Sequence, residues 1–376
     1  MLIKTIHAKK IKDSRGEYTI EVSVNNCKAS SPSGKSTGRH ETPCWHKSLD
    51  WNIKAISSLK FNFEMSSFND LKKVESLIKK QFRLRDAKLF GANALFALES
   101  AILKALARKN KKQLWQIINE KAKKMPIPVG NAVGGGLHSH HKESPIFQEF
   151  LLIPKGKTIV ENIEIMNNVY LKLKKELRSG KINDEGALET DAEEENILEL
   201  LSEFKDKVNI GIDVASSSFF NSPHYIYNDK SLSREEQIDY INELIEKYNI
   251  LYIEDPLDEE DFKGFSRIKK KNLVIGDDLT ATHKSRLLRA IKSKSINAMI
   301  IKPNQNGSLL ELAEIFKMCK KHKIKTILSH RSGETLDDAL ADYAFGFQAD
   351  FIKCGIATKW REVKLNRLIK IEKSPK

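Results

Sequence analysis

The 376-residue chain lacks the features that mark membrane and secreted proteins. It has no run of 18 apolar residues, so no membrane-spanning helix is expected. Residues 1–16 are basic and alternating and contain no apolar stretch, so no signal peptide is indicated. The four cysteines, Cys27, Cys44, Cys319 and Cys354, form no CxxC pair. Scattered cysteines indicate free thiols in a reducing cytoplasm rather than disulfides or a zinc framework.

A complete phosphate-binding P-loop is also missing. Residues 34–37, Gly-Lys-Ser-Thr, resemble the end of that motif, but Ala29 stands where its first glycine is required. Gly38 and Pro43 would break the helix that has to follow the motif. Segment 31–38 is therefore either a flexible lid or an ordinary loop.

Positive charge is concentrated in the first third of the chain. Residues 1–125 hold 26 Lys+Arg against 11 Asp+Glu (+15), and the remainder holds 38 against 39 (−1), which gives the net +14. Such an excess can attract nucleic acid or an anionic surface. The lysines are dispersed, however, and no RNA-binding motif accompanies them. A solvated surface explains them more simply, and no nucleic-acid partner is expected.

Residues 125–128, Met-Pro-Ile-Pro, mark an expected domain boundary. The first domain, 1–125, is predicted to be α+β because strands precede helices. Its strands are expected at 2–11 and 19–28, with helices at 46–60, 67–82, 91–108 and 111–122. The second domain, 126–376, has 251 residues, about the length of one (β/α) barrel.

Successive apolar runs in the second domain each end in a titratable residue. These residues are Asp213, Glu254, Asp277, Lys302, His330 and Lys353. From Glu254 onward the steps are 23, 25, 28 and 23 residues, each enough for one strand, one helix and two loops. The step of 41 residues before Glu254 predicts additional structure there. Titratable residues at successive strand ends are typical of a (β/α) barrel active site.

Three of these residues, Asp213, Glu254 and Asp277, are carboxylates. Carboxylates at neighbouring strand ends repel one another unless a cation lies between them. Ligation by oxygen alone suits Mg²⁺ better than Zn²⁺. The structural alternative is that the three acids cap helices or pair with surface lysines.

The remaining groups predict acid–base chemistry. Lys302 is expected to have a lowered pKa among apolar walls and cations, so that it can act as a base. Lys353 either does the same or pairs with a ligand carboxylate. Glu149 and Glu185, held beside other acids, are expected to stay protonated and act as acids. A base, an acid and a divalent metal together indicate β-elimination next to a carboxylate.

Nine segments of the chain resemble motifs of the enolase family. They are residues 13–16, 33–38, 91–94, 148–150, 184–186, 253–256, 276–280, 302–305 and 329–335. This family dehydrates 2-phospho-D-glycerate reversibly to phosphoenolpyruvate with Mg²⁺, in glycolysis and gluconeogenesis. The resemblance implies a small α+β lid domain followed by an α/β, enolase-type (β/α)8-like barrel, in a cytoplasmic carbon–oxygen lyase.

The resemblance also implies roles for single residues. The metal ligands would be Asp213, Glu254 and Asp277 for one Mg²⁺ and Ser36 for a second that arrives with substrate. Lys302 would remove the C2 proton, and Glu185 with Glu149 would protonate the leaving C3 hydroxyl.

The implied substrate-binding residues surround this centre. Arg331 and Ser332 would hold the phosphate, and a guanidinium suits that geometry. Lys353 would contact the substrate carboxylate, with His138 and His330 completing the pocket.

Two of the chain's departures from the family bear on the expectations above. The loop 138–149 is about two residues longer and more polar than usual. The family also implies a homodimer, but Lys373 replaces an acid that usually pairs with a base near the N-terminus, here Lys9. Two lysines would repel each other, which weakens the expectation of that dimer.

Two other functions stay open at this point. A non-catalytic binding protein on the same fold would use the basic first domain to hold nucleic acid. A related enzyme acting on unphosphorylated acids is disfavoured by the Arg331–Ser332 pair.

Overall fold

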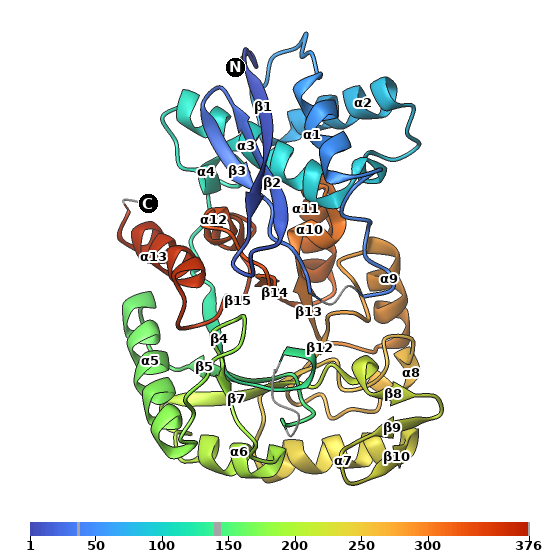
Figure 1. The fold of residues 1–376 in the computed structure, drawn as a ribbon, viewed down its shortest axis with the longest axis vertical. Coiled ribbons are helices and arrows are strands. Elements are labelled where there is room, and N and C mark those ends of the chain that lie inside the picture. The colour runs from blue at the N-terminus through green and yellow to red at the C-terminus, as the bar shows by residue number, and fades with distance from the viewer. Residues whose placement is uncertain (36–37, 139–143, 375–376) are drawn as a thin grey trace.

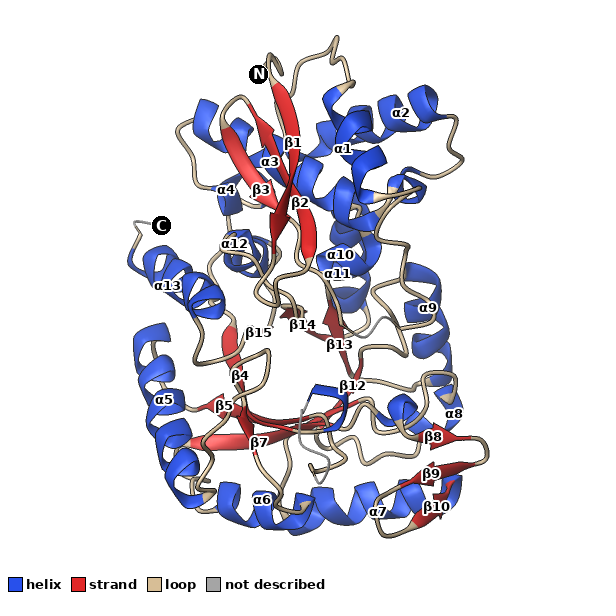
Figure 2. Cartoon of the chain, in the orientation of Figure 1, coloured by secondary structure: helices blue, strands red, loops and turns tan. Residues whose placement is uncertain are grey.

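A sheet-and-helix unit precedes a closed barrel in the computed structural model (Figures 1 and 2). The structure describes residues 1–35, 38–138 and 144–374, with the side chain of His138 excepted. The predicted metal ligand Ser36 and most of the polar insertion in the loop 138–149 lie outside the described residues. The arrangement confirms the predicted fold class.

The first unit is built on a three-stranded antiparallel sheet in the order β1-β2-β3. Its strands are β1 (Ile6–Lys12), β2 (Tyr18–Val24) and β3 (Cys27–Ser30). The single strand predicted over 19–28 was wrong, because the chain reverses between β2 and β3. Asn25 and Asn26 have φ angles of 47° and 64°, which asparagine tolerates better than most residues.

Helices cover this sheet and supply most of the first unit's core. They are α1 (Leu49–Ser57), α2 (Leu71–Phe82), α3 (Ala92–Lys109) and α4 (Leu114–Ile118). Helix α3 is buried along most of its length and packs against β2 and β3. The predicted helices are present, with later starts for α1 and α4 than the sequence suggested.

Eight strands among the described residues close the barrel, because β15 pairs with β4. They are β4 (Ile127–Gly134), β5 (Glu149–Pro154), β7 (Val208–Asp213), β11 (Tyr252–Glu254), β12 (Leu273–Gly276), β13 (Ala298–Ile301), β14 (Lys325–Ser329) and β15 (Phe351–Lys353). Strand β5 runs antiparallel to β4 and β7, whereas the other neighbours are parallel. The first residue of β5 therefore lies at the end of the barrel where the parallel strands finish.

The barrel interior changes from apolar to acidic along the strands. A separate apolar cluster, which includes Leu151, Tyr252 and Ile300, fills one part of the interior. Alternation along β11 directs both Tyr252 and Glu254 inward, and the Tyr252 hydroxyl donates to Glu254 Oε2 at 2.5 Å. The apolar filling therefore ends at carboxylates, which identifies the functional end of the barrel.

Helices surround the barrel (Figure 2). They are α5 (Ile159–Glu176), α6 (Glu194–Ser202), α7 (Arg234–Lys247), α8 (Phe262–Phe265), α9 (Lys284–Ser293), α10 (Pro303–Asn306), α11 (Leu309–Lys321), α12 (Ala339–Gly346) and α13 (Lys359–Lys373). Helix α7 begins with a capping box, since Ser233 and Glu236 exchange hydrogen bonds.

Short additional strands lie in two of the connections between barrel strands, the one between β7 and β11 and the one between β5 and β7. Between Asp213 and Glu254 the chain forms a small antiparallel sheet of β8 (Phe220–Asn221), β9 (His224–Ile226) and β10 (Ser231–Ser233). This confirms the prediction of extra structure there. Strand β6 (Leu188–Glu189) pairs with β4 after the turn 183–186. Among the described residues no helix combines the length and apolarity needed to cross a membrane.

Two acids meet where the first unit packs on the barrel. Glu99 of α3 is fully buried and accepts a hydrogen bond from the Leu309 backbone N–H at 2.7 Å. Glu75 lies beside it and accepts from Ser308 Oγ at 2.5 Å. Burial, reinforced by the Glu75 charge, raises the pKa of Glu99 well above its ordinary value. The folded protein therefore favours the protonated form of Glu99.

Glu99→Gln should remove a pH dependence of stability. Folded Glu99 keeps its proton above the pH at which the unfolded carboxyl loses it, so stability falls as pH rises through that window. The neutral glutamine escapes this penalty. Thermal unfolding should show a higher Tm for the variant than for the native chain at pH 8, and similar values at pH 5. A variant equally destabilised at both pH values would show that the proton is unimportant.

Candidate active site

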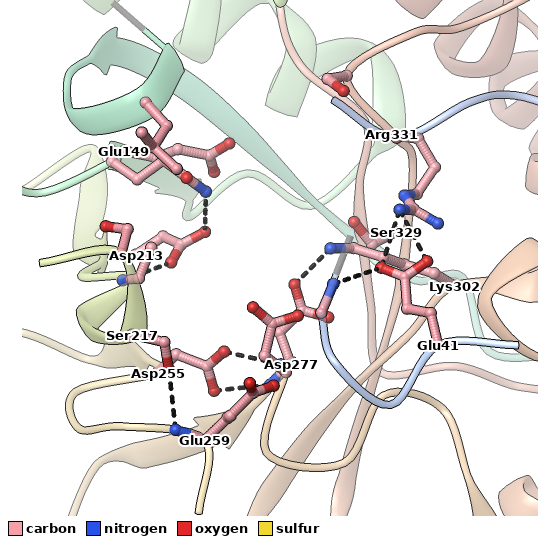
Figure 3. Close-up of a pocket in the computed structure, with 18 of the residues that line it drawn as sticks. Glu41, Glu149, Asp213, Ser217, Asp255, Glu259, Asp277, Lys302, Ser329 and Arg331 are labelled. Atoms are coloured by element: carbon pink, nitrogen blue, oxygen red, sulfur yellow. Dashed lines mark hydrogen bonds and ion pairs between the residues drawn. The ribbon is translucent and has the colours of Figure 1, made fainter. Parts of the chain in front are cut away.

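A cavity of about 220 Å³ opens at the acidic end of the barrel, beneath the loop that follows β3 (Figure 3). Its lining includes Gly34, Gly38, Arg39 and Glu41 from that loop, and Glu149, Glu185, Asp213, Asp255, Glu259, Asp277, Asp278, Lys302, Ser329, His330, Arg331, Ser332 and Lys353 from the barrel. Most of the residues predicted from strand ends are thus in one place.

The predicted metal-binding carboxylates come from three consecutive strands. Asp213 ends β7, Glu254 ends β11, and Asp277 directly follows β12. Asp213 and Glu254 are register partners, so their side chains start side by side. All three are buried. The structure therefore brings this predicted set to one rim of the barrel.

Glu149 joins them through the reversed direction of β5. As the first residue of that strand, it is the register partner of Asp213. Burial raises the pKa of Glu149 well above its usual value; the Lys353 charge opposes this shift, and the neighbouring charges of Glu185 and Asp213 add to it. Glu149 therefore favours its protonated form, as predicted for an acid.

Glu185 lies in the tight turn between α5 and β6. The Asn183 side chain accepts from the Glu185 backbone N–H at 2.9 Å, and Gly186, with a φ of +86°, completes the turn. The Glu185 carboxylate accepts from Asn131 Nδ2 at 3.3 Å and lies 3.6 Å from His330 Nε2. The turn thus directs a buried carboxyl into the cavity.

Lys353 is the cation at the centre of the carboxylates. Its Nζ lies 2.7 Å from Glu149, 3.1 Å from Asp213 and 2.9 Å from Glu254. Burial opposes its charge, but these carboxylates raise its pKa well above the ordinary lysine value. Lys353 is therefore permanently charged and pairs with two of the predicted metal ligands, which was one of the two interpretations given by the sequence.

The pKa expected for Lys302 was wrong. Burial does favour the neutral amine, but Lys302 forms an ion pair with Asp277, and the Asp277 and Glu254 charges raise its pKa above the ordinary value. The same pair holds the pKa of Asp277 below its usual value despite burial. Protein groups alone therefore keep Lys302 protonated.

The side of the cavity that holds Arg331 and Ser332 is formed by the loop after β14 and the loop after β3. Ser33 and Gly333 exchange backbone hydrogen bonds of 2.7 and 2.9 Å, and the Lys35 backbone N–H donates to Ser332 Oγ at 2.7 Å. Arg331 donates from Nη2 to both oxygens of Glu41 at 3.0 Å. Residues 31–35 are thus docked onto the barrel.

The two predicted histidines have different outcomes. His330 is buried, and burial lowers its pKa well below the ordinary value, so that it is neutral. Its backbone follows β14, as predicted from the strand rhythm. His138 ends the short 3-10 helix Gly136–His138, but its side chain lies outside the described part of the structure.

Glu41 and Asp255 are site residues that the sequence did not single out. Glu41 follows the lid motif by three residues and engages Arg331, which only the folded structure reveals. Asp255 has a φ of 41°, and its two carboxylate oxygens accept from the backbone N–H groups of Asp277 and Asp278 at 2.9 and 2.7 Å. Its acidic side chain next to Glu254 was the only available signal.

The donor chemistry fits a hard divalent cation. Asp213, Glu254 and Asp277 offer only carboxylate oxygens, as Mg²⁺ prefers. Burial and the Asp213 charge raise the pKa of Glu254 to about 8, and the Lys353 charge opposes this shift. A second group, Asp255, Asp277 and Asp278, has oxygens within 4.8 Å of one another. Asp255 already accepts hydrogen bonds from the backbone N–H groups of Asp277 and Asp278. Its carboxylate is therefore better suited to holding Asp277 in place than to binding a metal ion.

Comparison with known proteins gives matches over nearly the whole chain. The family model described as "Enolase, N-terminal domain" matches residues 3–118, and "Enolase, C-terminal TIM barrel domain" matches 122–374. A protein named Enolase from Archaeoglobus fulgidus is 37% identical over 99% of this chain and 97% of its own length. Enolases of Sulfurisphaera tokodaii and Picrophilus torridus are 35% and 34% identical over 98% of the chain, covering 95% and 98% of their own lengths.

Two aspartate substitutions should distinguish the candidate ligand sets. Mg²⁺ at 100 times its Kd should stabilise the native chain by about 2.7 kcal/mol, measured as a rise in Tm. Asp213→Asn should abolish this rise, because it removes a predicted ligand. Asp278→Asn should preserve it. The opposite pattern would assign the ion to the Asp255–Asp277–Asp278 group instead.

Proposed function

The chain belongs to the enolase family of lyases, and we propose that it catalyses the Mg²⁺-dependent, reversible dehydration of 2-phospho-D-glycerate to phosphoenolpyruvate. The observation that carries this proposal is the placement of the proposed base, Lys302, and the proposed acid, Glu149, on opposite sides of the cavity. Lys302 and Arg331 lie on one side and Glu149 on the other, with Asp277 between them (Figure 3).

Lys302 is the base that removes the proton from C2. A Mg²⁺ ion held by Asp213, Glu254 and Asp277 would neutralise the negative charge that develops on the substrate carboxylate. If Asp277 held a metal ion, its charge would no longer raise the pKa of Lys302 to the same extent. The Arg331 charge also lowers the pKa of Lys302. Both effects make the neutral amine accessible in the assembled site.

Glu185 and Glu149 supply the proton for the leaving hydroxyl. As the C2–H bond breaks, its electron pair forms the C2–C3 double bond, and the C3 hydroxyl leaves as water after protonation. Burial favours the protonated form of Glu149. The Glu149 side chain lies next to that of Glu185. Neutral His330, 3.6 Å from Glu185, adds a polar neighbour without introducing a charge.

Arg331 and Ser332 hold the phosphate, and Lys353 contacts the substrate carboxylate. Arg331 is 4% exposed and already binds a carboxylate, Glu41, with two hydrogen bonds, so its guanidinium is directed toward anions. We assign the remaining contacts to Ser36, as a ligand of a second Mg²⁺, and to His138.

The wider assignments rest on the family. We propose a division into domains 1–125 and 126–376, a place in cytoplasmic glycolysis and gluconeogenesis, and a homodimer. The family models, which match residues 3–118 and 122–374, support the domain division. Lys9, which the family would pair with an acid near the C-terminus, forms an ion pair with Glu21 of the neighbouring strand at 3.2 Å.

Lys302→Ala should reduce dehydration on the order of 10³-fold, since a positioned base contributes about 10²–10⁴ to the rate. The measurement is the ultraviolet absorbance of phosphoenolpyruvate formed from 2-phosphoglycerate at saturating Mg²⁺.

Lys284→Ala is the matched control, because Lys284 forms an exposed ion pair with Glu314 on the outer helices. It should retain the native rate. Full activity of Lys302→Ala would disprove the assignment of the base, and an inactive native chain would disprove the proposed reaction.

A further inference from the structure

Arg361, near the start of α13, is a buried cation without a carboxylate partner. Its relative exposure is 0%, and it has no ion pair among the residues that the structure describes. Burial of a charge is costly unless it is paired or fully hydrogen-bonded. An apolar side chain of similar size would fill this position at lower cost, so stability alone does not explain an arginine here.

The guanidinium of Arg361 links two loops of the active site. Nη1 donates to the backbone oxygen of Asp184, in the turn that carries Glu185, at 3.2 Å. Nη2 donates to the backbone oxygens of Arg331 and Ser332 at 3.3 and 2.9 Å. One planar side chain thus joins the proposed acid turn to the proposed phosphate-binding segment, which are almost 150 residues apart in the sequence.

The surrounding backbone fixes this arginine in place. Gly355 has a φ of +74° and passes so close that a Cβ atom there would lie 2.8 Å from Arg361 Cγ. The helix that carries Arg361 packs against α5 and α12, which flank the same part of the barrel. The side chain therefore has little freedom, and its hydrogen bonds define the separation of the two loops.

We propose that Arg361 is a positioning residue that sets the acid turn 183–186 relative to the phosphate-binding segment 331–332. It touches neither substrate nor metal. This inference rests on the proposed function, because it matters only if Glu185 protonates a substrate whose phosphate is held by Arg331 and Ser332.

The proposal predicts that the two halves of the reaction separate when Arg361 is lost. Lys302 directly follows β13, and the proposed metal ligands lie at the ends of β7, β11 and β12. The hydrogen bonds of the Arg361 guanidinium go to other segments of the chain. Removal of the C2 proton should persist, whereas protonation of the C3 hydroxyl should fail because Glu185 is misplaced. A purely structural defect would reduce both steps together.

The test compares Arg361→Met and Arg361→Lys with the native chain at saturating substrate and Mg²⁺. Phosphoenolpyruvate formation is followed by absorbance, and exchange of the C2 hydrogen with solvent deuterium by NMR. Arg361→Met should lose on the order of 10²-fold in kcat for dehydration, while the ratio of exchange to dehydration rises at least about tenfold. Arg361→Lys should lie between the two, because an ammonium reaches one loop but lacks the guanidinium fork.

Arg367→Met is the matched control on the same helix. Arg367 is a half-buried arginine that binds Asp342 at 2.7 Å and Gln113 at 3.0 Å, away from the cavity. It should lower Tm with kcat and the exchange ratio unchanged. The inference is overturned if Arg361→Met keeps the control's kcat, or if exchange and dehydration fall in proportion in both Arg361 variants. An inactive native chain would instead disprove the proposed function.

Discussion

The crowding of buried carboxylates at one end of the barrel is the constraint on which the rest of the site depends. Glu149, Asp213 and Glu254 surround a single ammonium, that of Lys353, and Asp277 engages Lys302. Burial, together with the charges of neighbouring carboxylates, raises the pKa values of Glu149 and Glu254 despite the opposing charge of Lys353. Such an arrangement is unfavourable for stability by itself and becomes favourable when a divalent cation binds.

The fold makes this crowding possible because each of these charged residues lies at the end of a different barrel strand. Hydrogen-bonded neighbours fix the spacing of Asp213 and Glu254, and the reversed β5 adds Glu149 at the same rim. The first unit then supplies the cover, since the loop after β3 docks on segment 331–333 through backbone hydrogen bonds. Strand order therefore gathers the titratable groups at one rim of the barrel, and the described part of the loop after β3 covers that rim.

The sequence revealed the strand-end residues because a (β/α) rhythm places them predictably at one rim. It also revealed the additional structure between Asp213 and Glu254, because these two strand-end residues are 41 positions apart. It could not reveal that Lys302 pairs with Asp277, because the sign of a lysine pKa shift depends on distances between strands. The same limit hid Glu41, whose partner Arg331 is 290 residues away, and Arg361, which binds Asp184 at a separation of 177 residues. The split of strand 19–28 was missed because Asn-Asn is a weak turn signal beside alternating valines.

The most direct test of the central claim is the dehydration of 2-phosphoglycerate by the native chain across a Mg²⁺ titration, followed by chelation. If the carboxylate rim is a metal site that enables proton removal from C2, phosphoenolpyruvate formation should saturate with Mg²⁺, cease with chelator and return when Mg²⁺ is restored. Dehydration that continues unchanged in excess chelator, or its absence at every Mg²⁺ concentration, would contradict the account.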